Sequence, residues 1–254
     1  MEIIPLDKNE IKAYLTNKSL NALYIFDSLE STNTTARQLQ KAGAKHATLI
    51  AAESQSGGKG RYGRYFHSPK GTGIYFSILL ERDKLPVENS TLLTIFAGVC
   101  TCRALRQLTG KEIQIKWIND IFLKGKKIGG ILAEAVDGFF ILGIGLNITP
   151  STDPFPEEIG EFVEFLYEGC EVPVSRNEII GMIVSNLLEP GSQSDLLQEY
   201  KTYSAVLGNP ITITEGKLTY EGKALDIDEK GRLIIEKENG LKTALCSGEV
   251  RIKL

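Results

Sequence analysis

The sequence lacks the features that mark secreted, membrane-spanning and strongly basic proteins. Its first residues have neither the basic nor the apolar region of a signal peptide, and it has no stretch of about 18 apolar residues that could span a membrane. Lysine and arginine total 29 against 32 aspartates and glutamates among 254 residues, a formal net charge of -3. Because nucleic-acid-binding domains are usually basic, we expect a cytoplasmic protein that binds neither a membrane nor nucleic acid.

Cysteine is scarce, with four scattered residues. Cys100 and Cys102 are too close together for an ordinary disulfide, and no second pair completes a metal-binding set. Histidine is scarcer still, with two residues, and we expect a structural or solvent-facing role for His67. We expect free thiols, as in a reducing compartment, at all four cysteines, which are Cys100, Cys102, Cys170 and Cys246.

The pattern of apolar residues, caps and turns predicts an α+β chain. Alternation and β-branched residues predict strands, and capping residues with glycine stops predict helices. Hairpins mixed with helices, rather than a repeating strand–helix–strand pattern, favour a largely antiparallel sheet. The expected strands are 22–27, 48–52, 73–80, 112–117, 130–135 and 139–146, and the expected helices are 31–43, 89–110, 176–188 and 195–203.

The pattern changes near residues 207–210. From there the chain has closely spaced glycines, short apolar runs and no helical period, which predicts a small all-β barrel of about 45 residues. We therefore divide the chain into residues 1–206 and 207–254. The expected strands of the second part are 211–214, 222–227, 233–237, 241–246 and 250–252.

The glycine-rich run 57–64 (Gly-Gly-Lys-Gly-Arg-Tyr-Gly-Arg) is the most informative segment. Glycines let a backbone approach a ligand closely, and three cations among them would hold an anion such as a phosphate or a carboxylate. The run matches neither the Walker A motif nor the dinucleotide-binding fingerprint. The alternative is a charged, solvated face.

Three other segments carry polar or glycine patterns with two interpretations each. Residues 31–33 (Ser-Thr-Asn) could cap a helix or bind a polar head group. Residues 116–120 (Lys-Trp-Ile-Asn-Asp) could form a polar site at a strand end, or Asn119-Asp120 could simply begin a turn. Lys126 and Lys127, which follow, could belong to that site or lie at a solvated hairpin tip. Gly143 and Gly145 share one strand face and mark either a close ligand approach or a crowded sheet contact.

Taken in order, these segments resemble the biotin–protein ligases over nearly the whole chain. The matching motifs are S-T-N at 31–33, Q-x-x-G-x-G-R-x-G-R at 55–64, K-W-x-N-D at 116–120, K-x-x-G-I-L at 127–132, G-x-G-L-N at 143–147 and the terminal S-G-E-V at 247–250. The resemblance implies a catalytic domain like those of class II aminoacyl-tRNA synthetases, followed by a small SH3-like barrel.

The family makes biotinyl-5′-AMP from biotin and ATP, normally with Mg²⁺. It then transfers biotin to a lysine of a biotin carboxyl carrier protein or domain of a biotin-dependent carboxylase. Some relatives carry an N-terminal DNA-binding domain, but only about 20 residues precede the first expected strand here. We therefore expect the monofunctional type, and the resemblance also allows a homodimer.

The resemblance also implies roles for individual residues. Arg61, Lys127 and Asp120 would be catalytic, with Asp120 facing the acceptor lysine and Arg64 joining the two cations at the triphosphate. No metal ligand is assigned. Biotin and the nucleotide would be held by the remaining residues, which are Ser31, Thr32, Asn33, Gln55, Gly58, Lys59, Gly60, Phe66, Asn119, Gly130 and Asn147, beside an apolar wall at Gly73 and Tyr75.

Two positions depart from the family pattern. Lys59 replaces an arginine and so lacks the two-pronged donor group, and Ile118 replaces a proline. A lipoate ligase or octanoyltransferase is the nearest alternative, because it shares the catalytic fold. A regulator that binds biotin or DNA without catalysis is the other. Loop 57–64 and segment 116–120 favour biotin, and the full set of charged residues favours an enzyme.

Overall fold

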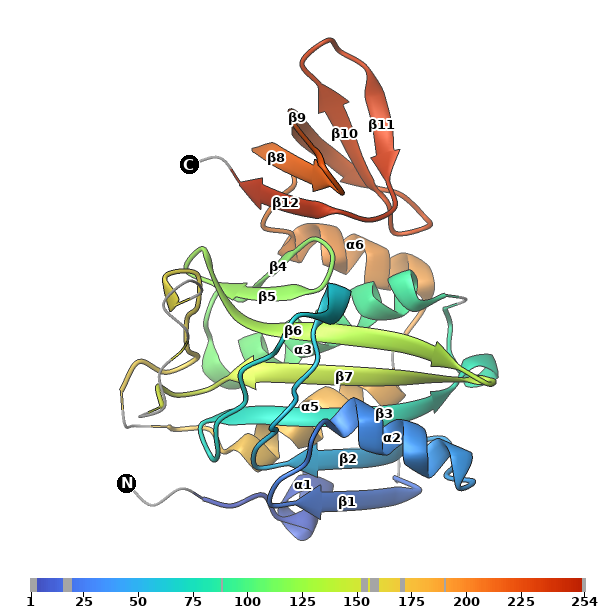
Figure 1. Ribbon diagram of the computed structural model, residues 1–254, viewed down its shortest axis with the longest axis vertical. Helices are drawn as coiled ribbons and strands as arrows, with labels where there is room; N and C mark the ends of the chain where they lie inside the picture. Colours follow the sequence, from blue (N-terminus) through green and yellow to red (C-terminus); the bar gives the residue numbers. More distant parts are fainter. Residues whose placement is uncertain are drawn as a thin grey trace.

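The computed structural model describes residues 4–15, 20–87, 89–151, 155, 160–169, 172–189 and 191–252. It holds a seven-stranded sheet in the order β1-β2-β3-β7-β6-β5-β4 and a five-stranded sheet in the order β11-β10-β9-β8-β12 (Figure 1). In the large sheet β1 and β2 are parallel and the other neighbours are antiparallel. The expected α+β class with a largely antiparallel sheet is confirmed.

The first part of the chain supplies the large sheet and its helices. Its elements are α1 (Lys8–Ala13), β1 (Ala22–Phe26), α2 (Thr32–Lys41), β2 (Thr48–Ala52), β3 (Gly73–Glu81), α3 (Ser90–Thr109), β4 (Gln114–Lys116), β5 (Asp120–Leu123), β6 (Lys126–Val136), β7 (Phe139–Asn147), α5 (Arg176–Leu188) and α6 (Gln193–Tyr203). Two short 3-10 turns, η1 (Arg61–Gly63) and η2 (Arg82–Lys84), complete it.

Helix α3 shows how local sequence sets these bounds. The Asn89 side chain accepts a hydrogen bond from the Leu92 backbone N–H, which satisfies one of the unpaired donors at the start of the helix. Gly110 ends the helix in the left-handed region, at a φ of 66°, where glycine carries no steric penalty. The helix expected over 89–110 is confirmed.

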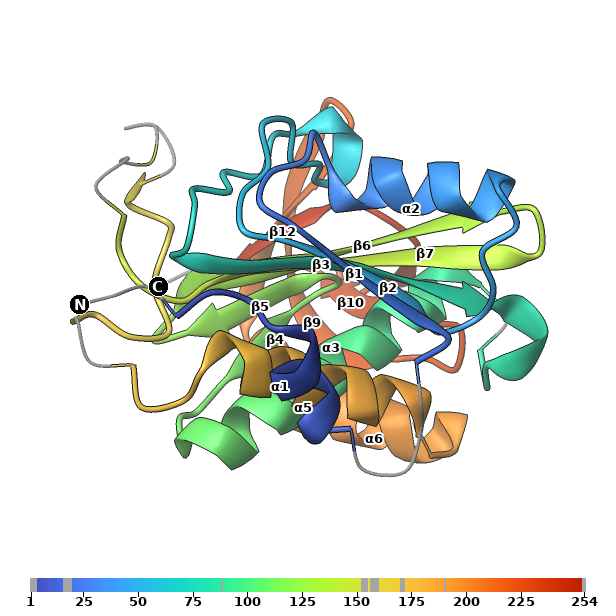
Figure 2. The same ribbon diagram turned by 90° about the horizontal axis from the view of Figure 1, so that it is seen from below.

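The two faces of the large sheet are covered differently (Figure 2). Helix α2 packs on one face, against β2, β3 and β7, and α3 and α5 pack on the other. The main core lies on the α3 side and includes Phe76 and Ile144. A smaller cluster lies under α2 and consists of Ala36, Ile50, Leu79 and Ile141. Helix α2 therefore leaves the β4–β5 part of its face open for other segments.

The second sheet is antiparallel throughout, and its elements are β8 (Pro210–Glu215), β9 (Leu218–Ile227), β10 (Leu233–Lys237), β11 (Lys242–Leu245) and β12 (Glu249–Ile252). Its apolar residues belong to the same core cluster as those of the large sheet. The buried Trp117 indole N–H donates to the Gly231 carbonyl at 3.1 Å and joins the two parts. The SH3-like barrel remains a prediction.

The structure also bears on the remaining expected elements, on the cysteines and on membrane-spanning helices. One strand and one α-helix were not expected, namely β5, which begins at Asp120, and α1, whose first turn is capped by the Asp7 carboxylate. Cys100, Cys102 and Cys246 are free thiols, and Cys170 lies outside the described residues. Within the described part of the chain, no helix is long and apolar enough to cross a membrane.

Candidate active site

Five neighbouring strands each contribute one residue to a single line across the large sheet, which we call the central row. The pairing register places Lys116 opposite Asp120, Asp120 opposite Gly130, Gly130 opposite Gly145, and Gly145 opposite Tyr75. Residues directly opposite one another point to the same face of a sheet. The row therefore has an ionic end, a glycine centre and an aromatic end, on the face that carries α2.

A β-bulge brings a second lysine to the ionic end. Between β5 and β6 the register shifts, so that Ile121 pairs with Gly129 but Phe122 pairs with Lys127. The extra residue, Ile128, is buried. A bulge reverses the alternation of the side chains that follow it, and Lys127 consequently shares a face with Asp120. The Lys127 ammonium lies 2.6 Å from an Asp120 carboxylate oxygen.

Gln55 joins the start of α2 to the loop that follows β2. Its side-chain oxygen accepts from the Thr32 backbone N–H at 2.8 Å, and its side-chain nitrogen donates to the Ser68 hydroxyl at 3.0 Å. Gln55 thereby satisfies an N–H at the helix start. Ser31 occupies the N-cap position, but its side chain makes no capping hydrogen bond. The capping interpretation of 31–33 therefore fails for the Ser31 hydroxyl.

Asn33 is held by partners from β3 and β6. The Ser77 hydroxyl lies 2.6 Å from the Asn33 amide oxygen and 2.7 Å from the Thr32 hydroxyl. The Asn33 amide nitrogen donates to Glu134 at 2.7 Å, and the same carboxylate pairs with Arg37 at 2.8 Å. Buried polar networks specify a geometry when their members are satisfied, so the Asn33 amide is fixed in position.

The glycines of β7 make room for site side chains. A Cβ added at Gly143 would lie 2.2 Å from the Asn33 amide oxygen, and one added at Gly145 would lie 2.6 Å from the Phe66 ring. Of the two interpretations of these glycines, the crowded contact describes this structure. The crowding comes from two predicted site residues, which rest directly on the strand.

Residues 54–72, which we call the arm, form a folded-back ladder above the sheet. Hydrogen bonds join its two sides, from Gln55 N–H to the Ser68 carbonyl, from Phe66 N–H to Gly58, and from Gly60 N–H to Arg64. The turn at its tip is η1. The glycine-rich run is thus a structured hairpin-like extension with Arg61 at its tip.

The predicted cations all have partners in the described structure. Arg61 donates to the Asn119 side-chain oxygen at 2.9 Å, which ties the arm tip to the turn before β5. Arg64 forms an ion pair with Glu249 of β12. Lys59 lies away from Arg61 and Arg64, and it donates to the Thr34 hydroxyl at 2.9 Å. Arg61 and Lys127 therefore contact adjacent residues, Asn119 and Asp120, whereas Lys59 contacts neither of them.

Lys116 belongs to the site but was not among its predicted residues. Burial lowers the pKa of its ammonium from the ordinary value. Asp120 opposes that shift, and Lys127, Arg251 and Arg64 add to it. Its place beside Trp117 in segment 116–120 was the available signal. The sequence analysis also missed Ser68, Ser77 and Glu134, of which Ser77 could have been noticed as the lone serine in an apolar strand.

Asn147 lies at the end of β7, apart from the arm tip. It pairs with Gly73 across the β3–β7 register, and its backbone carbonyl accepts from Leu166 N–H at 3.0 Å. Its amide nitrogen donates to the Glu164 carbonyl at 3.4 Å. The structure thus places Asn147 on the face of the central row, beside residues 164–166.

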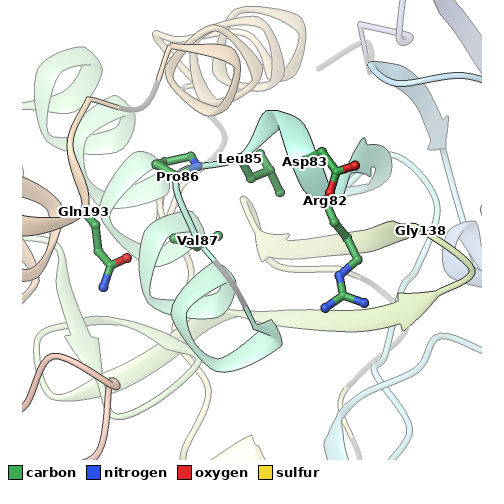
Figure 3. Close-up of a pocket in the computed structure, with 7 residues that line it drawn as sticks. All are labelled: Arg82, Asp83, Leu85, Pro86, Val87, Gly138 and Gln193. Atoms are coloured by element: carbon green, nitrogen blue, oxygen red, sulfur yellow. The ribbon is translucent and has the colours of Figure 1, made fainter.

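A cavity of about 450 Å³ lies elsewhere on the molecule (Figure 3). None of its lining residues is a predicted site residue; they are Arg82, Asp83, Leu85, Pro86, Val87, Gly138 and Gln193. Among the described residues, no group of three or more histidine, cysteine, aspartate or glutamate side chains could hold a metal ion. This cavity is therefore not the candidate site predicted from the sequence.

Comparisons with known proteins identify the family of the chain. Residues 25–149 match the Biotin/lipoate A/B protein ligase family, and residues 206–252 match the biotin protein ligase C terminal domain. The chain is 30% identical to a bifunctional ligase/repressor BirA of Bacillus spizizenii, over 93% of this chain and 76% of that protein. It is 27% identical to a biotin–[acetyl-CoA-carboxylase] ligase of Mycobacterium tuberculosis, over 97% and 95% of the two chains.

A solved structure shares the fold. The biotin protein ligase from Aquifex aeolicus, in complex with biotin and ATP, superimposes with a TM-score of 0.79 at 27% identity, covering 92% of this chain and 99% of that one. The chain therefore belongs to the biotin protein ligase family and is an enzyme of that type.

Proposed function

We propose that this enzyme attaches biotin to one lysine of a biotin carboxyl carrier protein or domain, by way of biotinyl-5′-AMP. The observation that carries the proposal is the central row. It runs from an ionic end at Asp120 and Lys127, across Gly130 and Gly145, to Tyr75. Two residues beyond Tyr75 on β3, Ser77 joins the polar network of Thr32, Asn33 and Gln55. Biotin has a polar ureido ring and a carboxylate at opposite ends, and the row together with this network offers partners for both.

In the first step, a biotin carboxylate oxygen would attack the α-phosphorus of ATP, and pyrophosphate would leave. Two anions must approach each other, so fixed cations are needed where negative charge develops. Arg61 and Lys127 supply that charge at one turn, and Arg61 can grip two phosphate oxygens with its planar donor group. Arg64 would join them once it exchanges Glu249 for phosphate.

In the second step, the lysine amine of the carrier would attack the acyl carbon, and AMP would leave. The amine must be neutral to attack and must lose a proton. Asp120 is the carboxylate of the central row and would orient the amine and accept that proton. The Lys127–Asp120 pair at 2.6 Å keeps the carboxylate aimed along the row.

At the other end, we propose that Ser31, Thr32, Asn33 and Gln55 line the ureido pocket, helped by backbone groups around Gly58 and Gly130. Gly73 and Tyr75 would form the apolar wall. The nucleotide would lie toward the remaining predicted residues, which are Lys59, Gly60, Phe66, Asn119 and Asn147. Phe66 already rests on Gly145 and stands edge-on to Tyr75, with 6.4 Å between ring centroids.

The described side chains do not fit a resident magnesium site, because they include no metal-binding cluster. Magnesium usually binds through few carboxylates together with substrate phosphates. We therefore include Mg²⁺ only as the counter-ion that ATP carries, and assign it no ligand in this chain.

We further propose that residues 1–206 form the catalytic domain and 207–254 the C-terminal domain of a cytoplasmic enzyme. Edge strand β1 of the large sheet leaves room for a homodimer.

Biotin-dependent exchange of pyrophosphate into ATP tests the first step, and transfer of labelled biotin to a carrier domain tests the second. Exchange with biotin and none with lipoate is the expected result. Exchange with lipoate or octanoate instead would favour the alternative ligase. Biotin binding without exchange would favour a regulator without catalysis.

A further inference from the structure

A buried ion pair lies at the base of the arm. Arg176, the first residue of α5, meets Glu53, the residue after β2, at 2.7 Å, and their side chains are only 7% and 9% exposed. Neither residue belongs to the predicted site. Burying two charges costs several kcal/mol per ion before their attraction offsets it, so the pair calls for an explanation other than stability.

The pair connects the two ends of the arm. Glu53 immediately precedes the arm and Gly73 immediately follows it. One guanidinium nitrogen of Arg176, Nη1, donates both to the Glu53 carboxylate and to the Gly73 carbonyl, the latter at 3.2 Å. The Glu53 carbonyl also accepts from Gly71 N–H at 3.2 Å. Arg176 therefore fixes the separation of the two sides where the arm leaves the sheet.

The other carboxylate oxygen and the other terminal nitrogen of the pair also have partners. The second Glu53 oxygen accepts from Leu6 N–H at 2.6 Å, and the second guanidinium nitrogen, Nη2, donates to the Ile4 carbonyl at 2.7 Å. Arg176 itself stands on a helix whose start is capped by Ser175. A group held by several hydrogen bonds on a rigid element is well suited to hold a neighbouring segment in one geometry.

We propose that Arg176 is a positioning residue for the biotin end of the site, acting through Glu53 and the base of the arm. The proposal rests on the function proposed above. Gln55 lies two residues beyond Glu53, and its two side-chain bonds join Thr32 to Ser68. A shift at the base therefore moves Gln55 and the backbone near Gly58. The arm tip is held separately, by the Arg61–Asn119 bond.

The test compares Arg176→Lys with Arg103→Lys. Arg103 forms a two-bond ion pair with Glu199 between α3 and α6, away from the arm, and serves as the matched control. Lysine keeps the charge but cannot span two acceptors with a planar group. Pyrophosphate exchange gives KM for biotin, KM for ATP and kcat, and thermal unfolding gives the stability of each variant.

We expect Arg176→Lys to raise KM for biotin about ten- to a hundredfold, with kcat and KM for ATP near the wild-type values, the pattern of weakened binding without a changed chemical step. Arg103→Lys should change Tm without changing KM for biotin. Equal effects of Arg176→Lys on all three constants, or an unchanged KM for biotin, would overturn the proposal.

A double variant, Glu53→Leu with Arg176→Met, separates position from charge burial, because apolar replacements of a buried ion pair are often neutral or stabilising. A folded double variant with raised KM for biotin supports the proposal, and one with wild-type KM refutes it. If the double variant does not fold, the single comparison still decides. If the wild-type enzyme shows no biotin-dependent exchange, the proposed function fails instead.

Discussion

Each glycine of β7 matters through the side chain that occupies its space. Gly143 admits the Asn33 amide and Gly145 admits the Phe66 ring. Asn33 then reaches Ser77 and Glu134 at normal hydrogen-bond distances. The sequence pattern could predict that these glycines are important. The reason lies in Asn33 and Phe66, two side chains that are far away in the sequence.

Gly143→Ala should damage the biotin end of the site. The added Cβ would lie 2.2 Å from the Asn33 amide oxygen, so the amide must leave its partners. We expect a stability loss of about 1–3 kcal/mol and a rise in KM for biotin of about tenfold, measured by urea unfolding and pyrophosphate exchange. Gly169→Ala is the control, because nothing lies within 4 Å of its added Cβ. An unchanged KM for biotin would show that Asn33 does not contact it.

His46 should make stability depend on pH. Its ring nitrogen Nδ1 accepts from the Glu81 N–H at 3.0 Å, which requires the neutral ring. Burial, followed by Lys84, lowers the His46 pKa below 6.5. As pH falls through 6.5, the unfolded chain therefore binds a proton before the folded chain does, and stability falls until the folded pKa is reached.

Urea unfolding at pH 7 and at about pH 5 measures this effect in the wild type and in His46→Gln, whose amide oxygen can also accept the Glu81 N–H. The wild type should lose more stability than the variant. Lys84 lowers the Glu81 pKa below 4.5, so the contribution of Glu81 is lost only in more acidic solution. Equal losses in both proteins would mean that His46 titrates normally.

At the scale of secondary structure, the arm is a ladder whose two sides nearly touch. A Cβ added at Gly58 would lie 2.3 Å from the Phe66 carbonyl oxygen and 2.8 Å from the Ser68 hydroxyl. Backbone atoms cannot move aside as a flexible side chain can, so an alanine there must push the two sides apart. This contact determines the shape of the glycine-rich run.

Gly58→Ala should loosen the arm, and trypsin should then cut faster at Lys59, Arg61 and Arg64. Because we propose that the arm closes over the acyl-adenylate and keeps water away, biotin with ATP should slow cleavage of the wild type. The same ligands should protect the variant less. If the cleavage rate changes neither with the substitution nor with the ligands, the arm does not close over the acyl-adenylate.

The strands show where sequence patterns succeed and where they stop. Alternation and β-branched residues located β3 and β7 almost to their ends, and capping residues located α3 and α5, because these signals are local. The bulge at Ile128 has no such signal. Strict alternation through β6 would put Lys127 on the opposite face from Gly130, and only the pairing with β5 shows that they share one. Spatial neighbours such as Glu134 and Asn33 likewise lie about 100 residues apart, beyond any local pattern.

At the scale of the whole molecule, the two sheets share one core. Apolar residues of β8–β12 belong to the same cluster as those of the large sheet. Trp117 adds a buried hydrogen bond to Gly231, and Arg64 adds an ion pair to Glu249. The turn that holds Asn119 and Asp120 therefore depends on contacts from the C-terminal part.

We predict that both parts unfold together. Trp117 is the single tryptophan of the chain and lies at their junction, so its fluorescence reports separation of the sheets, while circular dichroism reports both. The two urea transitions should coincide, which is the test of a two-state process. A fluorescence change at lower urea than the loss of secondary structure would show that the C-terminal sheet detaches first.

The ion pairs of the candidate site also affect what the enzyme attracts from a distance. Lys127 and Arg64 are matched by Asp120 and Glu249, so their charges largely cancel beyond a Debye length. Nonspecific attraction to RNA and DNA depends on uncompensated positive charge, and this acidic molecule, at -3 overall, keeps little of it at these two positions. A small polyanion that fits the site can displace the carboxylates of Asp120 and Glu249 from the two cations at close range. A long polyanion farther away experiences a nearly neutral surface at these positions.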